Sequence, residues 1–336
     1  MHRAFATLAA LLLLAAPATA KEFFGRDSVN EWIDQYRQKP EPNRLPAAVK
    51  ILSKSLAFKD PESAGIYVGF VAGVIGSEPQ RADKLIARML PLPAGDQWVV
   101  VRAVAYSGLP NWRRLLQDIA PRLPTRSEMI DGYLSGRLPT LDAVALDQSP
   151  TWLERLKMSW SNTKPAQNVT FAANPELLDT LWGVYFATGA EAPARRILTV
   201  LPWSKERDNV ERLTVGNLAK VTLVNNASRY PELLAMLKAM KPQQPEVTAK
   251  VLADVIAAAE TADGPRLRKE ALAAIDDLRR KGPGTKREIA LWGQIGQGAL
   301  ALGCIAAAAA SLTTLGLPCV VGGAVVSAGL YYYAAQ

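Results

Sequence analysis

The feature that most restricts how this chain can fold is a run of 48 residues, 289–336, without a single charged side chain. The run follows Glu288 and consists mainly of Ala, Gly, Leu and Val. A helix needs about 20 apolar residues to cross roughly 30 Å of hydrocarbon, and residues 289–314 are long enough. A soluble helix of this length normally has a polar face, which this run lacks. We therefore expect the run to contact lipid.

A helix break divides the run into two apolar segments. Leu315-Gly316-Leu317-Pro318 is typical of a helix end followed by a new helix start. The second segment ends in three tyrosines, as in an aromatic belt at the lipid boundary. The run predicts a membrane-inserted helical hairpin, and a hairpin buried in the core of the protein is the alternative. The residues expected in lipid are Leu291, Leu300, Leu302, Ile305, Leu312, Val320, Val325 and Leu330. Those expected at the membrane interface are Lys286, Arg287, Trp292, Tyr331, Tyr332 and Tyr333.

The segment before the run is strongly basic, with eight basic and three acidic residues between Gly264 and Arg287. Positive residues beside a span usually mark the cytoplasmic side, whereas the start of the chain predicts export. A hairpin inserted from the exported side reduces this conflict, because both of its ends stay outside and its turn carries no charge. The basic residues would then lie at anionic head groups; a solvated helix face is the alternative.

The first twenty residues have the organisation of a secretory signal. A basic region ends at Arg3, an apolar stretch covers residues 4–16, and Ala18-Thr19-Ala20 supplies small residues for cleavage after Ala20. An N-terminal helix that stays attached is the alternative. We expect an exported, membrane-associated protein on the periplasmic or extracytoplasmic side. The single histidine, His2, would be removed, which excludes His-based catalytic triads and His-ligated zinc.

Both cysteines, Cys304 and Cys319, lie in the uncharged run. With a turn near residues 315–318, they would be about 10 Å or more apart along the hairpin, beyond the ~7 Å reach of a disulfide. We expect two apolar side chains, not a bridge. No metal or other cofactor is expected.

Between the two ends, the sequence predicts an all-α, helical-repeat (α-solenoid-like) body. The expected parts are an N-terminal half at 21–160, a linker at 161–173, a C-terminal half at 174–280 and a basic linker at 281–288. Aligning residues 61–81 with 175–195, an offset of 114, gives five identities, including Gly69 with Gly183. Farther on, an offset of 118 pairs Trp112 with Tyr230. Two related halves would explain this alignment, although Ala- and Leu-rich helices can imitate it.

Local patterns predict three helices of this body. Ser28-Val29-Asn30-Glu31 matches a capping box. Val247, Val251 and Val255 form an apolar stripe after Pro245. Residues 98–104 are rich in β-branched side chains, but no partner strand is evident, so we expect a helix there.

Candidate chemistry in the body is sparse. Glu128 and Asp131 lie three residues apart on an expected helix and could act as acid and base in glycosidic cleavage, although solvated surface carboxylates are the simpler interpretation. Aromatic and arginine side chains dominate protein interfaces, and packing between helices is the alternative for each tryptophan. The candidate partner contacts are Trp112, Arg113, Trp152 and Arg155.

These features predict a non-enzymatic, exported, membrane-anchored protein that binds or scaffolds other envelope proteins and contacts lipid through its tail. A membrane-active protein whose hairpin inserts into or permeabilises bilayers is the alternative, and an envelope hydrolase using only carboxylates is a third hypothesis. Self-association is left open. Nucleic acid is not an expected partner despite the formal charge of +8, because the basic surplus lies beside the tail of an exported protein.

Overall fold

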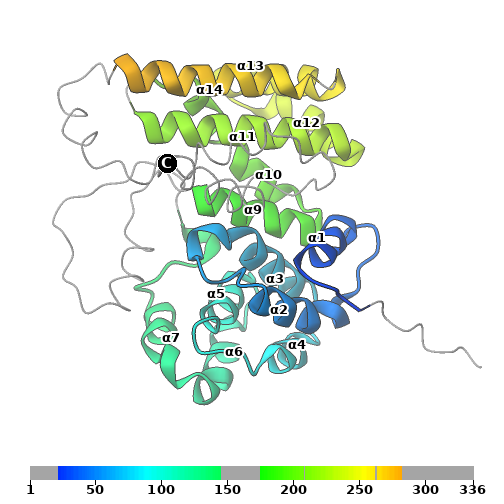
Figure 1. Ribbon diagram of the computed structural model, residues 1–336, viewed down its shortest axis with the longest axis vertical. Helices are drawn as coiled ribbons and strands as arrows, with labels where there is room; N and C mark the ends of the chain where they lie inside the picture. The colour runs from blue at the N-terminus through cyan, green and yellow to red at the C-terminus, as the bar shows by residue number, and fades with distance from the viewer. Residues whose placement is uncertain (1–21, 145–174, 208, 262, 282–336) are drawn as a thin grey trace, which may run out of the picture.

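A computed structural model describes residues 22–144, 175–207, 209–261 and 263–281 (Figure 1). Over these ranges the chain forms thirteen α-helices, short 3₁₀ turns and no strand, which confirms the all-α prediction. The helices before residue 145 are α1 (Arg26–Gln35), α2 (Leu45–Lys54), α3 (Gly65–Ser77), α4 (Ala82–Met89), α5 (Trp98–Tyr106), α6 (Trp112–Ile119) and α7 (Ser127–Leu134). Those after residue 174 are α9 (Pro175–Thr188), α10 (Glu191–Leu198), α11 (Val210–Arg229), α12 (Pro231–Met240), α13 (Glu246–Glu260) and α14 (Gly264–Lys281).

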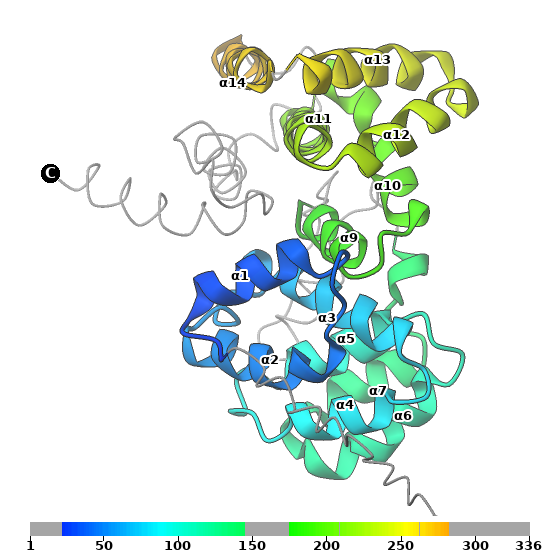
Figure 2. The same ribbon diagram turned by 90° about the vertical axis from the view of Figure 1, so that its right-hand side faces the viewer.

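The two halves of the helical body lie one beyond the other along the long axis of the molecule (Figures 1 and 2). Helices α4, α6 and α7 lie at one end, α3 and α9 near the middle, and α13 and α14 at the other end (Figures 1 and 2). The first half, up to α7, therefore meets the second half, from α9 onward, chiefly through α3 and α9.

Glycines allow α3 and α9 to touch backbone to backbone. A Cβ atom at Gly69 would overlap the carbonyl of Thr180, and one at Gly183 would overlap the carbonyl of Ile66. A side chain at either position would push the helices apart, so this close crossing requires glycine.

The two central helices run in the same direction. A Cβ atom at Gly65 would lie 2.5 Å from the Glu176 carbonyl, and one at Gly73 would lie 2.6 Å from the Ala187 side chain. Gly69 and Gly183, which the offset of 114 pairs, therefore both lie at the crossing. The two glycines that the sequence alignment pairs are therefore in contact in the structure.

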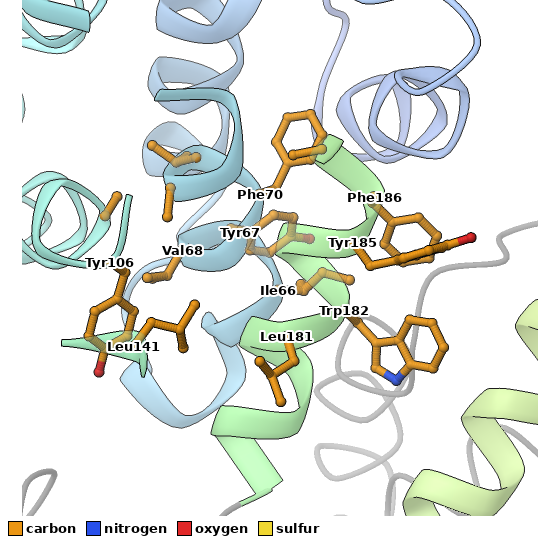
Figure 3. Close-up of a cluster of buried hydrophobic side chains, with 14 of the residues drawn as sticks. Ile66, Tyr67, Val68, Phe70, Tyr106, Leu141, Leu181, Trp182, Tyr185 and Phe186 are labelled. Carbon is orange, nitrogen blue, oxygen red and sulfur yellow. The ribbon is translucent and has the colours of Figure 1, made fainter. Parts of the chain in front are cut away.

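Aromatic side chains fill the core around this crossing (Figure 3). The Phe70 ring of α3 makes edge contacts with Trp32 and Tyr36 of α1, at centroid separations of 5.2 and 5.1 Å. On α9, the Trp182 ring lies 5.7 Å from Tyr185 and 6.1 Å from Phe186. Ring contacts of this kind stabilise the core, because the rings bury a large apolar area and edge-to-face arrangements are favourable.

Two of the local sequence predictions need correction. Helix α1 begins at Arg26, and the Ser28 hydroxyl accepts a hydrogen bond from the Phe24 N–H at 2.9 Å, so the predicted capping box does not form although the helix does. Val247 is 58% exposed, so the apolar stripe of α13 begins only at Val251. Residues 98–104 lie within α5 as predicted, and all nine residues of this helix are buried.

Candidate functional site

Helix α14 is the last described helix before the uncharged run of residues 289–336. Ala271 and Ile275 are buried, and the helix packs on α11 and α13. Its exposed acidic residues, Glu270, Asp276 and Asp277, come before the cations Arg279, Arg280 and Lys281 of its last turn. Cations are favourable at a helix C-terminus because the backbone carbonyls there carry partial negative charge. The helix therefore ends with positive charge eight residues before the run begins.

Local ion pairs stabilise the first turn of α14. The Arg266 guanidinium lies 2.6 Å from both Asp263 and Glu270, and hydrogen bonds to these carboxylates raise its pKa. Nearby, the largely buried Lys220 ammonium of α11 lies 3.9 Å from Asp254 of α13. Burial lowers the pKa of Lys220, and repulsion by Lys205 lowers it further. Cations from several elements thus meet at this end of the molecule.

The predicted membrane and interface residues, from Lys286 to Tyr333, lie outside the described residues, as do Trp152, Arg155, Cys304 and Cys319. Within the part of the chain that the structure describes, no helix combines the length and apolar character needed to cross a bilayer. The placement of the tail in lipid therefore stays a prediction.

The predicted contact pair Trp112 and Arg113 lies at the start of α6. Trp112 is only 8% exposed and packs into the core, whereas Arg113 is exposed and its guanidinium carbon lies 4.4 Å from the Trp112 ring centroid. A partner that bound at this position would contact the Arg113 side chain, which lies over the buried Trp112 ring. The role in partner binding stays a prediction.

The carboxylates Glu128 and Asp131 are both exposed on α7. This is the arrangement of solvated surface groups that the simpler interpretation predicts. Among the described residues, no group of three or more His, Cys, Asp or Glu side chains could hold a metal ion.

A buried ion pair that the sequence analysis missed joins the two halves. The Arg102 guanidinium of α5 lies 2.5 Å from the Glu176 carboxylate of α9, and their side chains are 0% and 2% exposed. The Arg102 guanidinium carbon also lies 4.6 Å from the Trp98 ring centroid. The sequence signal that could have indicated this pair is Arg102 itself, the single charged residue in the apolar sequence of α5. A cation on such a buried helix needs a buried partner. Without solvent access, the pair serves to hold the halves together.

Two tyrosines adjoin this ion pair. The Tyr106 and Tyr133 rings lie 6.2 Å apart, and burial raises the pKa of each hydroxyl above its ordinary value. Burial also raises the pKa of Tyr67, whose hydroxyl donates to Asn30 at 3.1 Å, to about 12. The folded state therefore keeps these three hydroxyls protonated at pH values at which the unfolded chain would lose the protons.

These tyrosines predict a loss of stability in alkali. Above pH 10 the unfolded chain releases phenol protons that the folded chain retains, so the free energy of unfolding falls as pH rises from 10 toward 12. Each buried tyrosine contributes a slope of about 1.4 kcal/mol per pH unit. Urea unfolding at several pH values in this range measures how steeply the free energy of unfolding falls with pH. In Tyr67→Phe this fall should be smaller by that amount per pH unit, and an unchanged fall would contradict the buried phenol.

Comparison with protein-family models, with curated proteins and with solved structures found no match.

Proposed function

We propose that this chain is an exported protein anchored to a membrane by residues 289–336, whose helical body binds other proteins of the cell envelope. The observation that carries the proposal is the position of the uncharged run, which begins eight residues after the cationic last turn of α14. Cations beside an apolar segment attract anionic head groups, at about 1 kcal/mol per residue near the surface. Helix α14, which packs on α11 and α13, would set the distance between body and membrane.

For the body, we propose a duplicated helical unit of the α-solenoid type. Support comes from the parallel contact of α3 and α9, in which Gly69 and Gly183 occupy matching positions. The order of elements also agrees, because α6 and α12 each continue directly into a short 3₁₀ turn that contains a proline, Pro121 or Pro242. Arrays of paired helices present extended surfaces to partners.

The test is cell fractionation of the full-length chain followed by high-salt and carbonate washes. The wild-type protein should stay with the membranes. Leu302→Arg should move to the soluble fraction, because an arginine at the centre of a bilayer costs about 2.5–3.5 kcal/mol. Gln117→Arg, which adds the same charge at an exposed position of α6, is the matched control and should behave like wild type. Release of the wild-type protein by carbonate would refute the anchor.

Dye release from liposomes separates this proposal from the membrane-active alternative. An anchor leaves vesicles intact at every lipid composition, whereas a hairpin that permeabilises bilayers causes leakage that Leu302→Arg abolishes.

A further inference from the structure

The side chain of Lys220, on α11, is only 8% exposed, and its ammonium makes no hydrogen bond with any residue that the structure describes. Among these residues it pairs with Asp254 of α13, whose carboxylate lies 3.9 Å away, beyond hydrogen-bond distance. The ammonium nitrogen reaches the surface, because it is not among the described side-chain atoms that are fully enclosed without a partner. Since an ammonium has three donors, Lys220 presents hydrogen-bond donors at a largely covered position beside α13.

A second cation lies beside the first. Lys205 is the last residue of the 3₁₀ turn η6 (Leu201–Lys205), and this turn packs so closely on α11 that a Cβ atom at Gly216 would overlap its backbone. Gly216 lies one helical turn before Lys220. Burial lowers the pKa of Lys220, and repulsion by Lys205 lowers it by more than attraction to Asp254 raises it. Two cations therefore meet where η6 and α11 contact each other.

The other charges near Lys220 belong to α14, which lies beside α11 and α13 at this end of the molecule (Figure 2). They are Arg266 and Glu270, which pair with each other at 2.6 Å, and Arg266 also pairs with Asp263 at 2.6 Å. These charges are thus already matched. What is left around Lys220 is two ammonium groups and the Asp254 carboxylate, an excess of positive charge that attracts an anion.

The Asp254 carboxylate restricts which anion fits. An ionised carboxylate only accepts hydrogen bonds, so an anion held by both lysines must also carry a hydroxyl that can donate to Asp254. Near neutral pH, inorganic phosphate has at least one such hydroxyl in both of its ionisation forms. Sulfate has none, and a phosphomonoester, with a second pKa of about 6, has lost nearly all of its own. The arrangement therefore favours inorganic phosphate.

We propose that Lys205, Lys220 and Asp254 form a binding site for inorganic phosphate, in which both ammonium groups donate to phosphate oxygens and a phosphate hydroxyl donates to the Asp254 carboxylate. We refer to these three residues as the phosphate site. Lys205 and Asp254 are exposed, so phosphate reaches the site from solvent without any rearrangement of the helices. The proposal is independent of membrane anchoring.

The test compares anions by thermal unfolding of the full-length chain at neutral pH and constant ionic strength. Phosphate should raise the Tm with saturation, because a ligand at ten times its Kd lowers the apparent unfolding constant about elevenfold. Sulfate and phosphate also stabilise proteins non-specifically, so sulfate provides the baseline. Sulfate and methyl phosphate should each bind about tenfold more weakly, since each lacks the hydrogen bond to the charged carboxylate.

Variants of the phosphate site locate the effect. Lys220→Met and Lys205→Met should each lose the response to phosphate above the sulfate baseline. Lys250→Met is the matched control, because Lys250 lies one turn before Asp254 on α13, is 75% exposed and pairs with Glu246. It should respond to phosphate like wild type.

Asp254→Asn tests the role of the carboxylate. A carboxamide can donate to an anion as well as accept, so this variant should bind phosphate and sulfate with similar affinity. A carboxylate that only stabilises the fold would change the Tm without changing the preference between the two anions. An unchanged preference in Asp254→Asn would therefore refute the hydrogen bond from the phosphate hydroxyl.

Equal responses of the wild-type chain to phosphate and sulfate, or a phosphate response that persists in Lys220→Met, would overturn the proposal. If Lys220→Met does not fold, Lys205→Met supplies the same comparison at an exposed position. Equilibrium dialysis of the wild-type chain with radiolabelled phosphate gives a direct second readout. We expect one phosphate per chain, displaced about tenfold less effectively by sulfate than by unlabelled phosphate; no bound phosphate would refute the site.

Discussion

Gly69→Leu should strongly destabilise the protein at the crossing of α3 and α9. The new Cβ atom would overlap the carbonyl of Thr180, which belongs to the backbone of α9 and moves only if the helices separate. Overpacking of this kind costs about 3 kcal/mol, which lowers the Tm of a domain of this size by roughly 6–12 °C. Thermal unfolding followed by circular dichroism measures the effect.

The matched control is Gly95→Ala, because a Cβ atom at Gly95 would have no neighbour within 4 Å. It should leave stability within about 0.5 kcal/mol of wild type. Gly183→Leu should reproduce the loss seen in Gly69→Leu, and the two losses should not add in the double variant, because both act on one contact. Wild-type stability in Gly69→Leu would show that the two halves do not meet through this crossing.

The second large effect is expected from Arg102→Met. It would leave the Glu176 carboxylate, 2% exposed, without its guanidinium partner. Removal of one partner from a buried ion pair costs about 3–5 kcal/mol, because an uncompensated charge stays in the core. Urea unfolding at neutral pH measures this loss as a lower midpoint with an unchanged slope.

The double variant Arg102→Met/Glu176→Leu distinguishes a lost ion pair from simple loss of packing. If the uncompensated charge causes the loss, the double variant should recover most of the stability, since replacing both partners of a buried pair is often neutral. Losses that simply add would contradict the assigned role of the pair in joining α5 to α9.

Much of the fold could be predicted because its signals are local. The β-branched segment now seen as α5 was expected to be helical only because no partner strand was found, and burial of the entire helix explains its apolar character. The alignment of Gly69 with Gly183 pointed to related halves, but the sequence alone gave no sign that these two glycines touch. That contact depends on the direction in which the halves pack.

The polar features of the core could not be predicted, because their partners are distant in sequence. Arg102 and Glu176 are 74 positions apart, and Arg37 and Glu232 are 195 apart. Arg37 follows a helix rich in polar residues, where an arginine is ordinarily a surface group. Only the packing of α1 against the second half surrounds Arg37 with the rings of Tyr185, Phe186 and Tyr230. The burial of Trp112, which was predicted to contact a partner, could not be predicted either. It depends on how α6 packs against the other helices.

The most direct test of the central claim is flotation of the purified full-length protein with liposomes in a density gradient. If residues 289–336 insert into lipid, the protein should float with anionic vesicles, and it should remain bound after a wash in 1 M salt, which screens charges beyond about 3 Å. Protein that stays at the bottom of the gradient, or that leaves the vesicles in high salt, would contradict a lipid-inserted tail.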